Sequence, residues 1–186
     1  MPTKPKAIHF SGDPEADELL AESPLALLIG FAHDQQITVQ QAFSGPLKLK
    51  QRLGHLDAAK IAALDPEKLA EVFREKPAVH RFPGNMAKRV QELCAVVAGE
   101  YEGDAARVWT DAKDTADLEA RIRGLPGFGD MKVVGLGSTL AKRLGVEVAA
   151  PLVPDRLCLG DVDSPEALEA YQAAKRARRS ALRAEA

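Results

Sequence analysis

The length, composition and charge of this chain are those of a globular protein with one domain, or one domain and a small lobe. It has 186 residues, of which 46% are hydrophobic and 28% are charged, and its formal net charge is −2. A wholly basic surface that coats nucleic acid is therefore excluded, and any phosphate must be bound by a local patch or by backbone groups. The two cysteines, Cys94 and Cys158, are too few for a disulfide scaffold, a four-cysteine zinc site or a four-cysteine iron–sulfur cluster.

No segment of the sequence has the pattern of a membrane span or a secretion signal. The longest apolar run, Pro24 to Ala32, is far shorter than the roughly 20 residues that a spanning helix needs. The first ten residues are basic and contain no apolar core. The four histidines lack the spacing of metal ligands (His9, His33, His55 and His80). We therefore expect a soluble, cytoplasmic protein without a bound metal.

Helix-start signals occur at four places in the chain. In each, an Asp or Ser precedes a proline: Asp13-Pro14, Ser23-Pro24, Asp65-Pro66 and Ser164-Pro165. The Asp or Ser side chain can accept hydrogen bonds from the first-turn amides, and a proline at the first helical position loses no hydrogen bond. Alternation typical of strands is nearly absent, and the one extended candidate is residues 146–153. The sequence therefore predicts an all-α protein.

Apolar residues at helical spacing predict a series of helices along the whole chain. In order, these are residues 14–22, 24–34, 38–44, 46–53, 57–62, 66–75, 85–99, 104–110, 115–123, 130–144 and 165–183. The first of these helices is acidic and the last is basic. The basic charge of the last helix has two interpretations, a solvated helix end that suits the helix dipole or an additional contact to phosphate.

A glycine-rich turn, Gly124 to Gly129, separates two of these helices and is the most informative part of the sequence. Gly127 and Gly129 can adopt positive φ angles, and we expect Phe128 to pack back between the two helices. The amides of such a turn and of the following helix end would then point outward together, which suits a phosphate group. Lys132, in the first turn of the second helix, could add a charged contact. The alternative is a connection between antiparallel helices that binds nothing.

Three motifs carry a resemblance to a known family. The segment Leu125-Pro126-Gly127-Phe128-Gly129 resembles the helix-hairpin-helix of the HhH-GPD superfamily of DNA glycosylases. Upstream, residues 34–39 (DQQITV) resemble the Q-Q-I-S segment of the alkyladenine-type branch, and residues 84–88 (GNMAK) are similar to the G-x-S-x-x-K turn before a long helix. The motifs occur in the family's order, and the resemblance covers about residues 24–160.

The resemblance implies an all-α fold of two lobes with a cleft between them. The first lobe would be a helical barrel formed by residues 24–150, with the helix-hairpin-helix at residues 115–144. The second lobe would combine residues 1–23 with residues 151–186, and the acidic and basic terminal helices would pack together there.

The resemblance also implies a function in base-excision DNA repair. It is closest to the monofunctional alkyladenine-type or endonuclease III-like branch without an iron–sulfur cluster, so we expect a monomeric DNA glycosylase that hydrolyses the bond to a flipped, damaged base in double-stranded DNA. Gln36 would support the opened base stack, although a helix cap or a buried polar residue is the alternative. The expected DNA contacts of the hairpin are Leu125, Gly127, Phe128, Gly129 and Lys132. The resemblance implies no cofactor except a monovalent cation held by carbonyl groups of residues 123–128.

The position of the family's nucleophilic lysine argues against a lyase reaction. Bifunctional members of the superfamily carry this lysine two residues after the second hairpin glycine, where this chain has Met131. Lys132 follows one residue later, which corresponds to a rotation of about 100° around the helix. We therefore expect hydrolysis without Schiff-base chemistry.

The position of the family's catalytic aspartate is also altered. An acid that stabilises positive charge on the sugar is expected at about residues 149–151, which are Ala, Ala and Pro. The next acid is Asp155, which we take as the candidate catalytic residue, with an ion pair to Arg156 or a cap as alternatives. If no acid reaches the site, the chain would be a non-catalytic DNA-binding or lesion-recognition protein. A helical interaction module that binds no nucleic acid is a third hypothesis.

Overall fold

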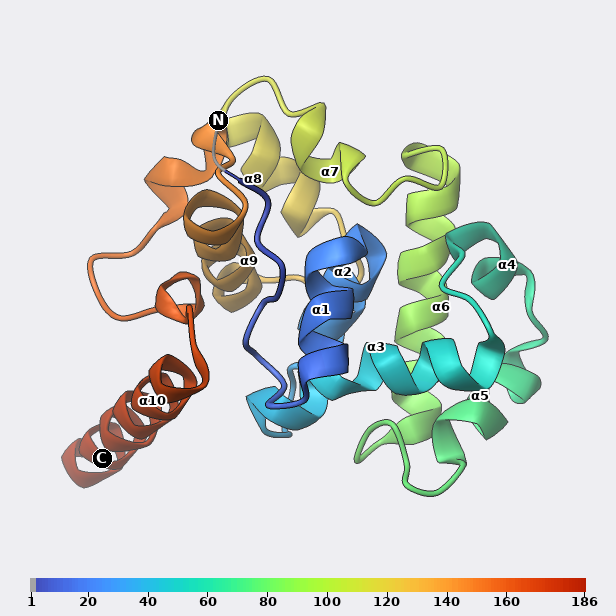
Figure 1. The fold of residues 1–186 in the computed structure, drawn as a ribbon, viewed down its shortest axis with the longest axis horizontal. Helices are drawn as coiled ribbons and strands as arrows, with labels where there is room; N and C mark the ends of the chain where they lie inside the picture. The colour runs from blue at the N-terminus through green and yellow to red at the C-terminus, as the bar shows by residue number, and fades with distance from the viewer. Residues whose placement is uncertain (1–2) are drawn as a thin grey trace.

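The computed structural model describes residues 3–186 and consists of helices and loops (Figure 1). Met1 and Pro2, which belong to the predicted terminal lobe, lie outside the described residues. No β-strand occurs in residues 3–186, so the predicted all-α class is confirmed.

The helices follow the predicted order, with differences at some boundaries. The α-helices are α1 (Pro14–Glu22), α2 (Pro24–His33), α3 (Val39–Leu53), α4 (Ala58–Ala63), α5 (Pro66–Arg74), α6 (Pro83–Glu100), α7 (Arg107–Thr110), α8 (Thr115–Arg123), α9 (Asp130–Arg143) and α10 (Pro165–Glu185). Two 3₁₀ helices, η1 (Glu147–Leu152) and η2 (Leu159–Asp161), lie between α9 and α10.

The four predicted helix starts are confirmed. In each, the side chain of the capping residue accepts a hydrogen bond from an amide two or three positions further on, and the proline occupies the first turn. For example, the Asp13 carboxylate accepts from the Glu15 amide at 2.9 Å, and the Ser23 hydroxyl accepts from the Ala26 amide at 3.1 Å. These local hydrogen bonds explain why the sequence predicts the starts of α1, α2, α5 and α10 so well.

The prediction of a helix break near residue 45 is wrong, because α3 continues through Pro46. A proline inside a helix leaves the carbonyl four residues earlier without its donor, and here that carbonyl belongs to Ala42. The structure supplies a replacement donor from another helix: Nδ1 of the buried His33 lies 3.3 Å from the Ala42 oxygen. Gly45 makes room for this imidazole, since a Cβ atom at position 45 would lie 2.3 Å from Nδ1.

The one extended candidate, residues 146–153, instead forms the 3₁₀ helix η1 over Glu147–Leu152, and only its end residues Val146 and Val153 are extended. The Thr115 hydroxyl donates to the Val148 carbonyl at 2.7 Å and ties η1 to the start of α8. Leu152 packs so closely on α9 that a Cβ atom at Gly137 would lie 2.7 Å from its Cβ. The absence of a side chain at Gly137 therefore permits the close packing of η1 on α9.

The apolar helix α2 lies at the centre of the molecule and is buried along its whole length. It packs on α3 and α6, while the hairpin formed by α8 and α9 packs on η1 and η2 (Figure 1). Three phenylalanines, Phe10, Phe31 and Phe43, meet edge to face with ring centroids 4.9–6.4 Å apart. This aromatic cluster joins the N-terminal segment, α2 and α3 into one core.

The two terminal helices do not pack on one another, contrary to expectation. Helix α1 packs on α2 and α3, whereas α10 contacts η2, is hydrogen-bonded to α3 through Gln172, and has a C-terminal end that extends away from the rest of the fold (Figure 1). The division into lobes at residues 24–150 and 1–23 plus 151–186 stays a prediction. Within residues 3–186, no helix is long and apolar enough to cross a bilayer.

Candidate nucleic-acid interface and adjoining cavity

The hairpin turn between α8 and α9 is stabilised by two short-range hydrogen bonds. The amide of Leu125 donates to the Ile122 carbonyl, and that of Phe128 donates to the Leu125 carbonyl, both at 3.1 Å. Gly127 adopts a φ of +78°, whereas Gly129 has a φ of −106° and is the N-cap of α9. Only the first of these two glycines therefore needs the left-handed conformation that the sequence suggested for both.

Four backbone amides of this turn and of the start of α9 have no hydrogen-bond acceptor within the described residues. They belong to Gly127, Gly129, Asp130 and Met131, all of which are exposed. The N-terminus of α9 also has no side-chain cap. Because the helix dipole adds its positive end at the same place, this turn can bind an anion through neutral groups.

Leu125 and Phe128, two of the predicted contact residues, are buried. Phe128 packs inward as expected, and Leu125 does the same. Their side chains therefore hold the turn in shape, and a contact to DNA from these two residues would have to come from their backbone.

The guanidinium group of Arg89, on α6, connects the hairpin with the Gln35-Gln36 segment. Its Nη1 donates to Oε1 of Gln35 at 2.9 Å. It also lies against Gly127, where a Cβ atom would be 2.6 Å from Nη1. The positive φ of Gly127 and the absence of its side chain thus bring a cation to the edge of the free amides. Arg89, which directly follows the motif at residues 84–88, therefore joins the hairpin motif to the Gln35-Gln36 segment.

The side chain of Lys132 is half-buried rather than free on the surface. Its Nζ donates to the Ala32 carbonyl at 3.3 Å and lies 5.3 Å from the centre of the Phe128 ring. Burial lowers the pKa of Lys132 to about 8, and the nearby Asp34 carboxylate opposes that shift. The Lys132 ammonium therefore joins the hairpin to the end of α2. Met131, which precedes it, is 70% exposed.

Gln36 occupies the tip of an exposed turn between α2 and α3. Its φ of +60° is unusual for a residue other than glycine, and its side chain borders two cavities. Phe82 lies across the smaller one, which has a volume of about 220 Å³, and is 41% exposed. A role for Gln36 in an opened base stack stays a prediction, and the position of Phe82 makes it a second candidate for such a contact.

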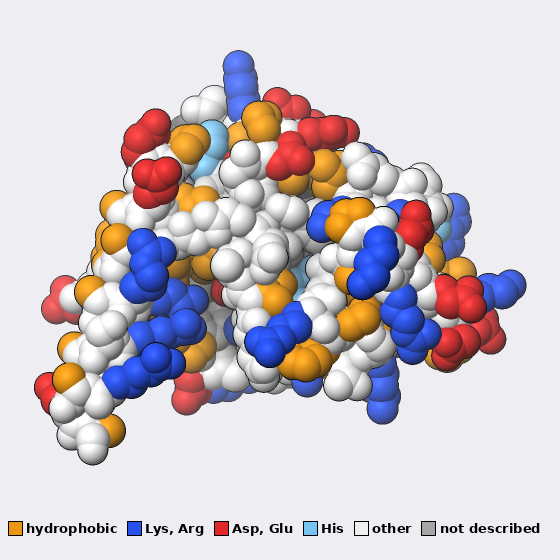
Figure 2. Space-filling view, turned by 90° about the horizontal axis from the view of Figure 1, so that it is seen from below, with side chains coloured by type: hydrophobic (Ala, Val, Ile, Leu, Met, Phe, Trp, Pro, Cys, Tyr) orange, Lys and Arg blue, Asp and Glu red, His pale blue; other side chains and the backbone are white. Residues whose placement is uncertain are grey.

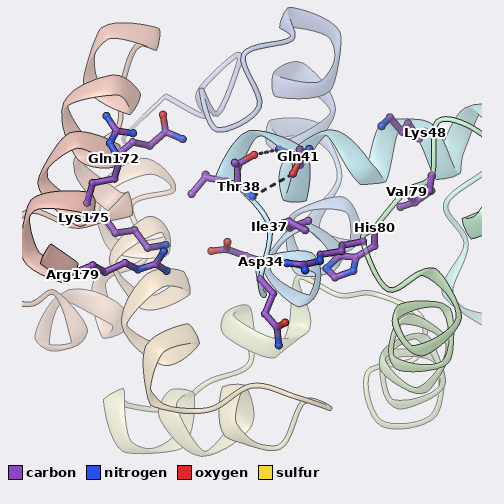
Figure 3. A pocket seen from close by; sticks show the side chains of 15 residues that line it. Asp34, Ile37, Thr38, Gln41, Lys48, Val79, His80, Gln172, Lys175 and Arg179 are labelled. Carbon is purple, nitrogen blue, oxygen red and sulfur yellow. Dashed lines mark hydrogen bonds between the residues drawn. The ribbon is translucent and has the colours of Figure 1, made fainter. Parts of the chain in front are cut away.

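The larger cavity has a volume of about 880 Å³ and lies between the α2–α3 turn and α10 (Figure 3). Its size is in the range of sites that enclose a small molecule or a nucleotide. Five cationic residues line it, namely Lys48, Arg81, Lys175, Arg176 and Arg179. The lining contains a single carboxylate, that of Asp34.

The basic face of α10 forms one wall of this cavity. Lys175 and Arg179 point across it toward the end of α2 (Figure 3), and Lys and Arg side chains gather along this helix beside a hollow in the surface (Figure 2). The helix is held to α3 by paired amide hydrogen bonds between Gln40 and Gln172. Of the two interpretations of the basic helix, this placement favours a contact to phosphate.

Asp155, the predicted catalytic residue, lies in the loop after η1 and is exposed. It lines neither cavity. Its catalytic role stays a prediction, and nothing in the packing of this loop directs the carboxylate to the hairpin or to α10.

His80 lines both cavities, and His33 is buried behind it. His33 is buried with its ring 6.1 Å from that of His80. The Nε2 atom of His80 lies 3.1 Å from the carbonyl oxygens of both His33 and Gln35, and its Nδ1 accepts from the Phe82 amide. Burial lowers the pKa of His33 to about 3. Both rings therefore fix the backbone that precedes and follows the Gln35-Gln36 segment.

Comparison with known proteins identifies the family. A model of the HhH-GPD superfamily of base excision DNA repair proteins matches residues 29–184. The chain belongs to this superfamily. Neither the curated proteins nor the solved structures yielded a match to the chain. The matched range includes α10, which the three sequence motifs did not cover, and the membership makes this a DNA-binding repair protein.

Three features of this HhH-GPD site were not identified from the sequence. They are the free carboxylate of Asp34, the bridging position of Arg89 and the exposed ring of Phe82. The only available signals were local: Asp34 precedes the two glutamines, and Phe82 precedes the proline that starts α6. Neither signal shows which side chains meet, because that depends on the packing of distant helices.

Proposed function

We propose that this HhH-GPD protein is a monofunctional DNA glycosylase of the alkyladenine-type or endonuclease III-like branch without an iron–sulfur cluster. It would hydrolyse the N-glycosidic bond of a damaged base that has rotated out of double-stranded DNA. The observation that carries the proposal is the position of the four free hairpin amides. Arg89 connects them with Gln35, and the next residue, Gln36, lines the cationic cavity of about 880 Å³. We also propose that the protein acts as a monomer in the cytoplasm.

The arrangement supports two separate contacts to the DNA backbone. The hairpin amides would hold one phosphate without a net charge, and the basic side of α10 would hold a second stretch of backbone. A nucleotide between these contacts would face the cavity, with Gln36 and Phe82 on the side of the remaining duplex. This geometry explains how a chain with a net charge of −2 could bind a polyanion.

A monovalent cation at the hairpin belongs to the same proposal. Within residues 123–128, the carbonyl oxygen of Leu125 accepts one hydrogen bond, from the Phe128 amide. Because a carbonyl oxygen has two lone pairs, this group retains the capacity to ligate a cation, which would add positive charge beside the bound phosphate.

A base-release assay tests the proposed activity. The protein is incubated with duplexes that each contain one alkylated, deaminated or oxidised base, and the free base is measured together with strand cleavage after alkali. We expect release from at least one duplex, with strand scission only after alkali treatment. Scission before alkali, together with a borohydride-trapped cross-link to Lys132, would contradict the monofunctional assignment. Tight duplex binding with no release from any substrate would favour the non-catalytic alternative.

Neutralising the cationic side of α10 is expected to weaken duplex binding and its salt dependence. The triple variant Lys175→Ala, Arg176→Ala, Arg179→Ala removes three charges that line the cavity. Loss of three phosphate contacts lowers the slope of log affinity against log salt by nearly 3, which fluorescence anisotropy across a salt series measures. The matched control removes Lys50, Lys60 and Lys68, which are exposed and line neither cavity. Equal slopes for the two triple variants would show that α10 does not contact the backbone.

A further inference from the structure

The side chain of Asp34 is free, although it lies inside the fold. Asp34 is the C-cap of α2, and its backbone amide donates to the Gly30 and Phe31 carbonyls at 3.1 and 3.2 Å. The backbone alone therefore fixes this residue. Within residues 3–186, its carboxylate accepts no hydrogen bond and forms no ion pair within 4.0 Å, and it points into the cavity toward α10 (Figure 3).

The charges around Asp34 explain how an unpaired carboxylate is tolerated there. Burial raises its pKa, while Lys175, Lys132 and Arg179 act in the opposite direction. These cations come from α9 and α10, and none of them forms an ion pair with the carboxylate; Lys175 and Arg179 line the same cavity as Asp34. A carboxylate in this position is available to a ligand, and it is the only one among the residues that line either cavity.

The chemistry of glycosidic cleavage requires a negative charge of this kind. As the bond between C1′ and the base nitrogen breaks, its electron pair leaves with the base, and positive charge develops on C1′ and the ring oxygen. A carboxylate near the sugar stabilises that charge, and it can take a proton from the water whose oxygen attacks C1′. The cations around it are placed for the flanking phosphates, which they would bind without occupying the sugar position.

We propose that Asp34, rather than Asp155, is the catalytic carboxylate of this protein. The inference rests on the proposed glycosylase function. In this reaction a water molecule adds its oxygen to C1′ and gives one proton to Asp34, which passes it on to the departing base nitrogen. The products are the free base and an abasic sugar with a hydroxyl at C1′, so no redox cofactor takes part. Lys132, on the second hairpin helix α9, is one of the cations that lower the pKa of Asp34.

The first test compares three aspartate variants in single-turnover base release from a duplex that the parent protein processes. Asp34→Asn is expected to slow release at least a hundredfold without weakening duplex binding, because it removes the charge and keeps the shape. Asp163→Asn, an exposed position before α10, serves as the matched control. Release by Asp34→Asn at the parental rate, or a larger loss in Asp155→Asn, would overturn the proposal and leave the glycosylase function standing.

The second test detects the charge without requiring turnover. A duplex with a pyrrolidine in place of one sugar carries a cation where positive charge develops, whereas a tetrahydrofuran duplex has the same shape and no charge. We expect the parent protein to bind the pyrrolidine duplex at least tenfold more tightly and Asp34→Asn to lose this preference. Equal binding of both duplexes by the parent would overturn the role of Asp34. Absence of base release from every substrate would overturn the glycosylase function and this inference together.

The stability of the Asp34→Asn variant distinguishes a catalytic role of Asp34 from a structural one. Because Asp34→Asn removes an unpaired, half-buried charge, its urea midpoint at pH 7.5 is expected to equal or exceed that of the parent protein. A lower midpoint, with base release lost in proportion to folded protein, would show that Asp34 acts on the fold and would overturn its catalytic assignment.

Discussion

A Gly127→Ala variant is expected to bind duplex DNA roughly ten- to a hundredfold more weakly than the parent protein, because hydrogen bonds to a charged group contribute about 1.5–3 kcal/mol each. Gly127 has a φ of +78°, and an added Cβ would lie 2.6 Å from Nη1 of Arg89. The Arg89 side chain must then move away from Gln35, and the turn can no longer present its amides in the same direction. Fluorescence anisotropy with an undamaged duplex measures the change.

The control for this variant is Gly54→Ala. Gly54 has a φ of +81° at the end of α3, with nothing within 4 Å of an added Cβ. Both substitutions therefore carry the same backbone penalty, of about 1 kcal/mol, but only one changes the hairpin. The salt slope of Gly127→Ala should stay close to the parental value because no cation is removed. If the two glycine variants bind DNA equally well, the hairpin amides do not hold phosphate.

Acidification is expected to destabilise the protein mainly through His33. The pKa of this histidine is about 3 in the folded state, against 6.5 for an ordinary histidine. Between these values the unfolded chain binds a proton that the folded protein excludes, so stability falls as the pH drops below 6.5. This proton uptake lowers the free energy of unfolding by about 2 kcal/mol at pH 5 and by roughly 4 kcal/mol at pH 3. Urea unfolding between pH 8 and pH 5 measures it.

The variant His33→Asn isolates this contribution. An asparagine retains a nitrogen near the position of Nδ1, which faces the Ala42 carbonyl, and it does not titrate in this range. The variant is expected to be less stable than the parent protein at pH 8. Between pH 8 and pH 5, however, its free energy of unfolding should fall by about 2 kcal/mol less than that of the parent. The raised pKa of Asp34 acts in the opposite direction and is common to both proteins. Parallel pH profiles of parent and variant would exclude His33 as the cause.

The position of His33 shows how far local sequence patterns can be trusted. A proline in the middle of a helical pattern predicts a break, because it removes a hydrogen-bond donor and clashes with the preceding turn. In α3 the missing donor is replaced by His33, which is nine residues away from Ala42 in the chain and lies on another helix. At residues 147–152, contacts with α8 and α9 likewise accompany a 3₁₀ helix where the local pattern offered an extended candidate.

Some parts of the site also depend on local sequence and others on the packing of distant segments. The hairpin could be predicted, since Leu125 to Gly129 encodes its own turn through glycine conformation and buried apolar side chains. The acid could not be predicted from spacing, since the family's usual position holds no carboxylate. Asp34 enters the cavity because α10, about 140 residues further along the chain, closes the opposite side.

The sequence by itself determined the all-helical class, the capped starts of four helices, and a turn whose amides can bind phosphate. Each of these depends on interactions within a few residues, for which residue type and spacing are sufficient. Only the tertiary structure decided which carboxylate faces the cavity, which cations surround it and that Arg89 meets the hairpin. Those features depend on the packing of helices that are distant in the chain, because burial and electric fields act through space and not along the sequence.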